Sequence, residues 1–212
     1  MLPLLGLWLY AASATAAPVF SDPNLEIAVR RAAARPEGEL TAADLTGIQM
    51  LIIPGGSVIS LGGIEKLVNL SWLDLARNPV RDIAPLAGLS KLTDLDLSDT
   101  FVTDFTPLAS IRSLKKLRLD HLGISDIGFL SGLVNLEHLS LCHNRIVNLE
   151  PLQSLLALKF LALEQNQITS VAPLRRNTEA GGLGPGDEVR IAGNPLTSGA
   201  LLADIPFLEG RG

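Results

Sequence analysis

The chain has 212 residues, of which 47% are hydrophobic and only 4% are aromatic. This composition is enough for one sizeable domain whose core is aliphatic rather than aromatic. The net charge is -5, and the lysines and arginines are scattered rather than gathered in a basic stripe, which argues against nucleic acid as a partner. The single cysteine, Cys142, excludes an internal disulfide.

Residues 1–16 have the character of a secretory signal peptide. They carry no charged side chain, are mostly apolar, and end in Ala14-Thr15-Ala16, a small-x-small pattern typical of a signal-peptidase site. The segment is shorter than the roughly 20 apolar residues that a membrane span needs. We therefore expect cleavage after Ala16 and a mature chain without a transmembrane segment. A buried helix and an uncut N-terminal anchor are the alternatives, and the missing basic residues depart from the signal pattern.

Residues 17–47 are expected to form a helical N-terminal cap. Asp22-Pro23 is a helix-start pair, with aspartate at the N-cap and proline at the first helical position. Arg35-Pro36 should end that helix, and residues 41–44 can start a second, shorter one.

From residue 48 to residue 179 the chain is periodic. The spacing L-x-x-L-x-L-x-x-N-x-I returns every 22 residues, in six copies that start at Ile48, Leu70, Leu92, Leu114, Leu136 and Leu158. The alternation within each copy has period two, as in a short strand whose leucines face inward. No single copy can bury its leucines alone, so the copies must stack on one another.

The second part of each copy turns the chain back. Four of the returns begin with a proline, namely Pro85, Pro107, Pro151 and Pro173. Since only about eight residues remain in each return, we expect 3₁₀ or single-turn pieces rather than a full α-helix. The predicted fold is an α/β solenoid, with a curved parallel β-sheet on one side and a thin convex side of 3₁₀ helices and turns on the other.

Residues 180–212 depart from the strict period. A glycine-rich insertion at 181–186 displaces a partial seventh copy, which reads Val189, Ile191, Asn194 and Leu196. Residues 198–208 predict a small closing helix that is broken near Pro206. We interpret this region as the insertion, the partial repeat and a C-terminal cap.

The repeats resemble the short bacterial leucine-rich repeats of the internalin type, and the resemblance covers nearly the whole mature chain. It rests on residues 22–26 (DPNLE) and 40–45 (LTAADL) of the cap, 82–89 (DIAPLAGL) of one convex return, and 193–196 (GNPL) near the end. The resemblance implies a right-handed solenoid that binds protein partners on its concave sheet, at a cell surface or outside the cell.

One position of the repeat is often asparagine. It is filled by Asn78, Asn144, Asn166 and Asn194, while Gly56, Thr100 and Leu122 interrupt the series. A buried amide can satisfy backbone groups in neighbouring turns. We therefore interpret this column as part of the fold rather than as a binding site.

The residues between the inward leucines face solvent and differ from copy to copy. One column runs Met50, Trp72, Asp94, Lys116, His138 and Phe160, and the next runs Ile52, Asp74, Asp96, Arg118, Ser140 and Ala162. Variation on a shared face leaves that face free for recognition, so we expect a protein partner to bind there. The candidate contact residues are Trp72, Asp74, Asp94, Asp96, Lys116, Arg118, His138 and Phe160.

Within this candidate face, Trp72 and Phe160 are the expected anchors, because exposed aromatic side chains often dominate interface energy. Packing of the two rings against neighbouring side chains is the alternative. The register should also pair Asp94 with Lys116 and Asp96 with Arg118 as exposed ion pairs, worth at most about 1 kcal/mol each.

Metal binding and catalysis have little support. His121 and His143 share one column with Cys142 beside them, so these three are weak candidates for a zinc site, with scattered surface histidines as the better explanation. The run Asp94-x-Asp96-x-Ser98 lacks the turn glycine and the bidentate acid of a calcium loop. We expect no cofactor and no enzymatic activity.

These observations favour a non-catalytic protein-binding module that is secreted, periplasmic or at the cell surface. The alternative is an intracellular scaffold or regulatory subunit of an enzyme, which would be cytoplasmic with its N-terminal segment retained. A zinc-dependent enzyme is a third and weaker hypothesis.

Overall fold

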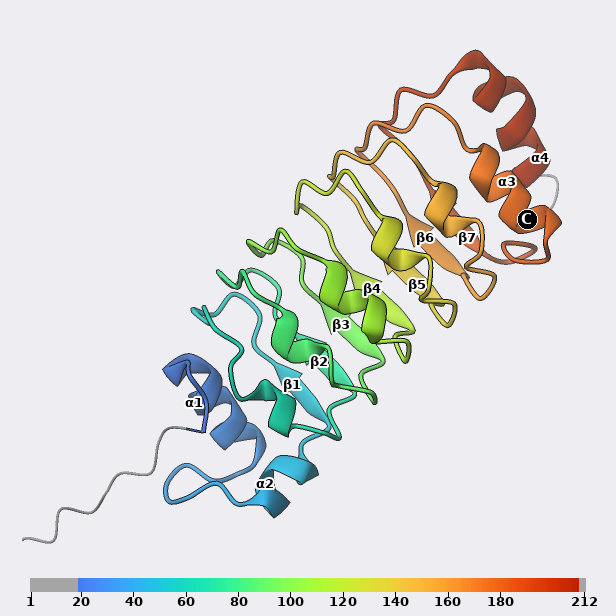
Figure 1. Cartoon of the computed structure of the whole chain (residues 1–212). Coiled ribbons are helices and arrows are strands. Elements are labelled where there is room, and N and C mark those ends of the chain that lie inside the picture. The colour runs from blue at the N-terminus through green and yellow to red at the C-terminus, as the bar shows by residue number, and fades with distance from the viewer. Residues whose placement is uncertain (1–18, 210–212) are drawn as a thin grey trace, which may run out of the picture.

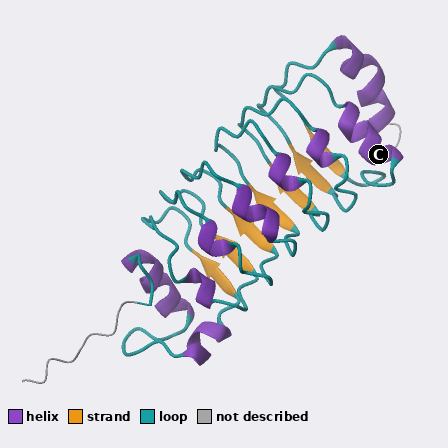
Figure 2. Ribbon diagram, in the orientation of Figure 1, coloured by secondary structure: helices purple, strands orange, loops and turns teal. Residues whose placement is uncertain are grey.

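The structure is a computed structural model that describes residues 19–209, so the expected signal peptide at residues 1–16 lies outside the described residues. Seven parallel strands form a single sheet in which each strand pairs with the next one along the chain. The strands line one side of an elongated solenoid, and short helices line the opposite side (Figures 1 and 2). The predicted leucine-rich solenoid with a parallel sheet is therefore confirmed.

Each strand has three residues and a central side chain that points into the core. The strands are β1 Met50–Ile52, β2 Trp72–Asp74, β3 Asp94–Asp96, β4 Lys116–Arg118, β5 His138–Ser140, β6 Phe160–Ala162 and β7 Glu188–Arg190. The central leucines of β1 to β6 align in one row, which Val189 of β7 extends. Those of β2, β4, β5 and β6 have no exposed surface. This row is the inner wall of the core.

The convex side is built mostly from short 3₁₀ helices, as predicted. They are η1 Ile64–Lys66, η2 Ala84–Leu86, η3 Thr106–Ser110, η4 Gly128–Leu130 and η5 Glu150–Leu152. Each turn buries one apolar side chain, such as Leu86 or Leu108, against the leucines of the sheet. A 3₁₀ turn suits so short a return because it advances further per residue than an α-helix.

The sixth return alone differs from the 3₁₀ or single-turn pieces that were expected in the returns. Helix α3, Ala172–Glu179, is a regular α-helix, and Pro173 lies in its first turn, where proline is tolerated. The fully buried Asn177 explains the difference. Its amide nitrogen lies 3.1 Å from the carbonyl oxygens of both Leu152 and Leu155, and its oxygen accepts from the Leu183 N–H at 2.8 Å. The glycine-rich insertion thus supplies a partner that the shorter returns lack.

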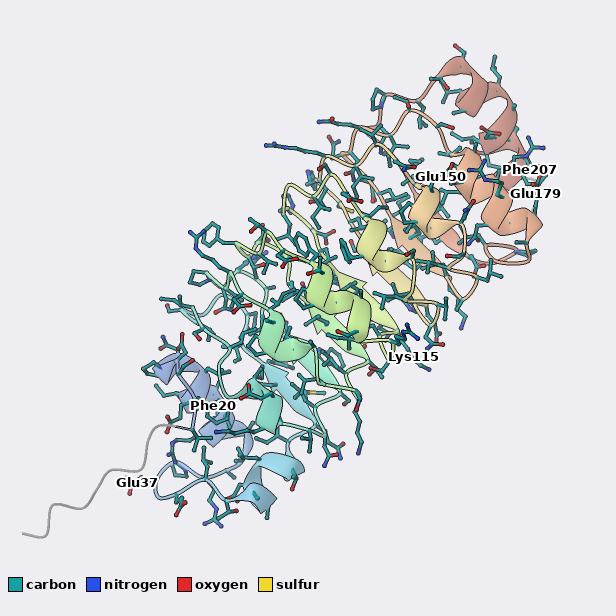
Figure 3. The ribbon with its side chains drawn as sticks, in the orientation of Figure 1. Phe20, Glu37, Lys115, Glu150, Glu179 and Phe207 are labelled. Atoms are coloured by element: carbon teal, nitrogen blue, oxygen red, sulfur yellow. The ribbon has the colours of Figure 1, made fainter. Side chains whose placement is uncertain are left out.

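The N-terminal cap contains two helices, α1 Pro23–Ala32 and α2 Ala42–Gly47. Asp22 is the N-cap of α1, as the Asp-Pro pair predicts, and Thr41 caps α2 in a reciprocal arrangement with Asp44. Phe20, labelled in Figure 3, is almost completely buried at this end. Helix α1 packs next to β1, the first strand of the sheet.

The C-terminal helical segment also departs from the prediction. A π-helical turn, η6 Ala200–Asp204, runs directly into α4, Ile205–Glu209, so Pro206 lies within a helix and does not break it. The wider π turn relieves the clash between the proline ring and the preceding turn. Both segments pack on α3 at the far end of the convex side (Figure 1).

The asparagine column forms the expected ladder. The side-chain nitrogen of Asn144 donates to the carbonyls of Leu119 and Leu141, and its oxygen accepts from the N–H of Ile124. Asn78, Asn166 and Asn194 bridge neighbouring turns in the same way. These amides therefore belong to the fold.

Candidate partner-binding face

The concave face consists of the first and third residues of each strand, whose side chains lie opposite the inward row. The strand register aligns all eight candidate residues in two columns on this face. Trp72, Lys116 and Arg118 are exposed, whereas the other five are half-buried. The sheet therefore gathers residues that are far apart in the sequence onto one continuous surface.

The part of this face formed by β1 and β2 is apolar. Met50, Ile52 and Trp72 expose 49%, 51% and 43% of their surface, and Met50 lies directly opposite Trp72 in the register. We call these three residues the apolar cluster. Exposed apolar side chains gathered in one place are a common mark of an interaction site, whereas single ones are not.

The central part of the face is charged. The Lys116 ammonium lies 3.6 Å from the Asp94 carboxylate, and the Arg118 guanidinium lies 3.6 Å from the Asp96 carboxylate, so both expected ion pairs form. Asp74 instead accepts a hydrogen bond from the Ala76 N–H and has no cationic partner among residues 19–209. The paired charges are largely neutralised, which leaves Asp74 as the unpaired acid beside the apolar cluster.

The part formed by β4 to β6 contains a shallow hollow of about 260 Å³. The rings of His138 and Phe160 stack along one side of it with their centroids 6.2 Å apart, and Lys116 and Arg118 also line it. Phe160 is only half-buried, but Arg190 of β7 lies over its ring, 5.1 Å from the centroid. Phe160 therefore packs against its neighbours, which is the alternative to a free anchor.

Two of the histidines and the cysteine lie at the edge of the concave face, just after their strands end. His121 and His143 stack with their ring centroids 4.2 Å apart and have positive φ angles of 60° and 56°. Arg77, Asp99 and Gln165 have the same backbone conformation at the equivalent position. This is a left-handed turn in which histidine and aspartate are over-represented, so repeat geometry explains why the two rings meet.

The thiol of Cys142 forms a hydrogen bond with an acidic side chain of the next repeat. It donates to Glu164 at 3.0 Å, and the Cys142 N–H donates to Asp120. Burial, together with the hydrogen bond to Glu164, raises the pKa of Cys142 to about 11, so the thiol is neutral at physiological pH. Within residues 19–209 no group of three histidine, cysteine or acidic side chains is placed to hold a metal ion.

Sequence reasoning missed two contributions to this face. Met50 and Ile52 were placed in the aligned columns but not among the candidate contacts, and both are about half exposed. Glu188 and Arg190 extend both columns by one strand, opposite Phe160 and Ala162. The glycine-rich insertion hid that continuation because it displaces the seventh copy from the period.

Known proteins share this architecture. The family model described as leucine-rich repeats in two copies matches residues 68–110, 112–154 and 134–176. A solved structure of internalin C2 from Listeria monocytogenes is 32% identical, with a TM-score of 0.69, and the match covers 88% of this chain and 91% of that one. The comparison with curated proteins gives no match. The chain belongs to the leucine-rich-repeat family.

Two further structures resemble it at lower identity. Internalin F from Listeria monocytogenes is 24% identical, with a TM-score of 0.53, over 88% of this chain and 68% of that one. A leucine-rich-repeat protein of Leptospira interrogans is 20% identical, with a TM-score of 0.63, over 80% of this chain and 49% of that one. These two support the fold alone, whereas the likeness to internalin C2 makes the chain a leucine-rich-repeat protein of the internalin type.

Proposed function

We propose that this chain is a non-catalytic protein-binding module that recognises its partner on the concave face. The observation that carries the proposal is the apolar cluster of Met50, Ile52 and Trp72, because a folded chain rarely leaves three such neighbours exposed without a use for them. Trp72 is the central anchor, since tryptophan is enriched among residues that dominate binding energy.

Variation along the face supports the same conclusion. The inward row is leucine in six consecutive strands, while the outward columns change from apolar to acidic to basic to aromatic. Folding requires only the inward row. The candidate contact residues are Trp72, Asp74, Asp94, Asp96, Lys116, Arg118, His138 and Phe160, and we add Met50 and Ile52 because both are exposed.

A role without catalysis fits the chemistry of the only cysteine. A thiol with a pKa of about 11 is a poor nucleophile at neutral pH, because the thiolate is the reactive form. The neighbouring histidines His121 and His143 stack on each other in the turns, and the sulfur donates to Glu164. We assign both features to the repeat architecture.

Export of the mature chain is part of the proposal. The small-x-small pattern at Ala14-Thr15-Ala16 supports cleavage by signal peptidase, and internalin-like relatives support a secreted or surface location. No helix within residues 19–209 is long and apolar enough to cross a membrane. Mass spectrometry of the protein from its native host should find Ala17 at the N-terminus. An intact Met1 in the cytoplasmic fraction would favour the alternative of an intracellular scaffold or regulatory subunit.

Site-specific cross-linking tests the binding face. A photoreactive amino acid at position 72 should capture a protein partner, whereas the same probe at position 81 on another surface should not. Once that partner is identified, the triple variant Trp72→Ala/Arg118→Ala/Phe160→Ala should weaken its binding at least about thirtyfold. Circular dichroism checks that the variant is folded.

The matched control reverses two charges outside the concave face. Arg81 lies over the Phe101 ring, and the Lys91 ammonium donates to Asn69, so neither belongs to the two columns. Arg81→Glu/Lys91→Glu should leave the affinity nearly unchanged. Loss of binding in this control, with normal binding by the folded triple variant, would move the site off the concave face.

A further inference from the structure

The two edge strands of the sheet, β1 and β7, have different neighbours. Strand β1 packs against α1 of the N-terminal cap, whereas η6 and α4 at the other end pack on α3. Strand β7 pairs with β6 alone among the described residues. Its outer edge is therefore open to another strand, and such an edge is a ready template for pairing.

The hydrogen bonds of β7 show which groups are free. The Glu188 N–H donates to Lys159, and the Arg190 carbonyl accepts from Leu163, so both of these residues bond toward β6. Because successive residues of a strand bond to opposite sides, the N–H and the carbonyl of Val189 face the open edge. A strand that pairs here would pair with Val189.

The core is also unfinished at this end. Val189 is half-buried, whereas the inward leucines beside it in the row are completely buried. A hollow of about 280 Å³ remains, lined mainly by apolar residues such as Leu183, Val189, Ile191 and Leu208. Leu201 and Leu202 of η6 expose 52% and 79% of their surface. Apolar surface therefore adjoins the free edge.

The charges on either side of Val189 indicate what occupies the edge. Glu188 and Arg190 lie on the concave face, and their side chains already contact each other at 2.6 Å. If a second β7 pairs antiparallel with the first, centred on Val189, then Glu188 of each copy lies directly opposite Arg190 of the other. The sequence Glu-Val-Arg is thus complementary to itself under a twofold axis.

We infer that β7 pairs with β7 of a second copy of this chain, so that two solenoids join end to end. In this dimer the two Val189 residues exchange their backbone hydrogen bonds, Glu188 and Arg190 form two symmetry-related ion pairs, and the apolar ends cover each other. The concave faces stay uncovered, so this interface is separate from the proposed partner site.

Charge reversal tests the pairing. The purified protein should show a concentration-dependent dimer by analytical ultracentrifugation and light scattering. Glu188→Arg or Arg190→Glu alone places like charges opposite each other twice and should weaken dimerisation at least about tenfold. The double variant Glu188→Arg/Arg190→Glu should restore it, because the exchanged charges are again complementary.

Glu37→Arg is the matched control, since it makes the same charge change on an exposed loop at the N-terminal end (Figure 3). It should leave the dimer unchanged. A protein that is monomeric at all accessible concentrations would overturn the proposal. So would single variants that dimerise like the original chain, because the dimer would then use another surface.

Disulfide trapping tests the register of the proposed β7–β7 pair. In the proposed pair the Cα atoms of Glu188 and the opposing Arg190 lie about 4.5 Å apart, within the range that a disulfide spans. In a Cys142→Ser background, a mixture of Glu188→Cys and Arg190→Cys chains should form covalent dimers under mild oxidation. Each chain alone should form far fewer, and equal yields in all three samples would contradict the antiparallel register.

Discussion

The two end layers of this solenoid are buried to different degrees. At the N-terminal end, Phe20, Leu25 and Val29 are almost completely buried. At the C-terminal end, Val189 and Leu208 are only half-buried. In a stack of repeats each layer is stabilised by its neighbours, so the end layers depend on their caps. The comparison teaches that the chain itself closes the first layer of this protein fully and the last layer only in part.

One carboxylate accounts for much of the difference. Asp22 accepts from the N–H groups of Asn24 and Leu25 at the start of α1, and also from those of Ile59 and Ser60 in the first repeat. It therefore caps a helix and joins the cap to the stack at the same time. At the other end η6 and α4 pack on α3, and Ile205 and Leu208 of α4 line the same hollow as Val189.

The largest loss of stability is expected from a substitution in the middle of the stack. It sets the upper limit against which substitutions at the two ends can be compared. Leu139 has no exposed surface and lies between Leu117 and Leu161 in the inward row. Leu139→Ala should lower the free energy of unfolding by about 2 to 5 kcal/mol, because it removes buried methyl groups and leaves a cavity. Urea denaturation followed by circular dichroism measures this. A neutral Leu139→Ala would mean that the repeat register is wrong.

The N-terminal cap should come next. Asp22→Ala removes the acceptor of four backbone N–H groups and should cost about 1 to 3 kcal/mol. Val58→Ala changes a buried apolar residue in the first repeat. It is a control that disturbs the packing of this end but keeps the Asp22 carboxylate. If Asp22→Ala lowered the free energy of unfolding by less than an exposed substitution does, the Asp22 carboxylate would not explain how the N-terminal end is closed.

The same carboxylate predicts a dependence on pH. Burial alone would raise the pKa of Asp22, but the four N–H donors outweigh it and hold the pKa below the ordinary value of 3.8. A carboxylate with a lowered pKa in the folded state stabilises the fold fully above its ordinary pKa and loses this contribution as the pH falls through the lowered value. The original chain should therefore lose more stability than Asp22→Asn does below about pH 4. Equal acid sensitivity of the two proteins would contradict this assignment.

The C-terminal end should tolerate a comparable change. Val189→Ala removes methyl groups that are only half-buried and should cost about 1 kcal/mol when measured in dilute, monomeric protein. Hydrogen exchange offers a second readout, because amides in the last layer should exchange faster than those of β1. Equal protection of β1 and β7 at the same dilution would mean that the two ends are closed equally well.

Local patterns predicted much of this fold. The spacing of the leucines predicted the sheet and its register, because each repeat must bury the same face against its neighbour. The Asp22-Pro23 pair predicted the start of α1 for an equally local reason. The predictions from Pro173 and Pro206 were wrong, since the effect of a proline depends on its position in the helical turn, and the sequence does not show that position directly.

The contacts of the candidate face were less accessible to sequence reasoning. The two ion pairs followed from the register, because residues at equal positions of adjacent strands must lie side by side. The contact of Arg190 with Phe160 did not, since the insertion displaced β7 from the period. Asn177 was also missed, because three of its four partners come from the preceding return and the fourth comes from the insertion.

The smallest effect is expected far from both ends, in the ion pairs between β3 and β4. Lys116 and Arg118 are exposed, and each nitrogen lies 3.6 Å from its carboxylate partner, so water screens the attraction. A double-mutant cycle of Asp96→Asn and Arg118→Gln should give a coupling energy of about 0.2 to 1 kcal/mol, which decreases further at high salt. The equivalent cycle with Asp94→Asn and Lys116→Gln provides the comparison one column away. A coupling above about 2 kcal/mol in either cycle would exceed what exposed pairs contribute. The charged centre of the concave face would then be needed for folding, and variation along that face would no longer support a binding site there.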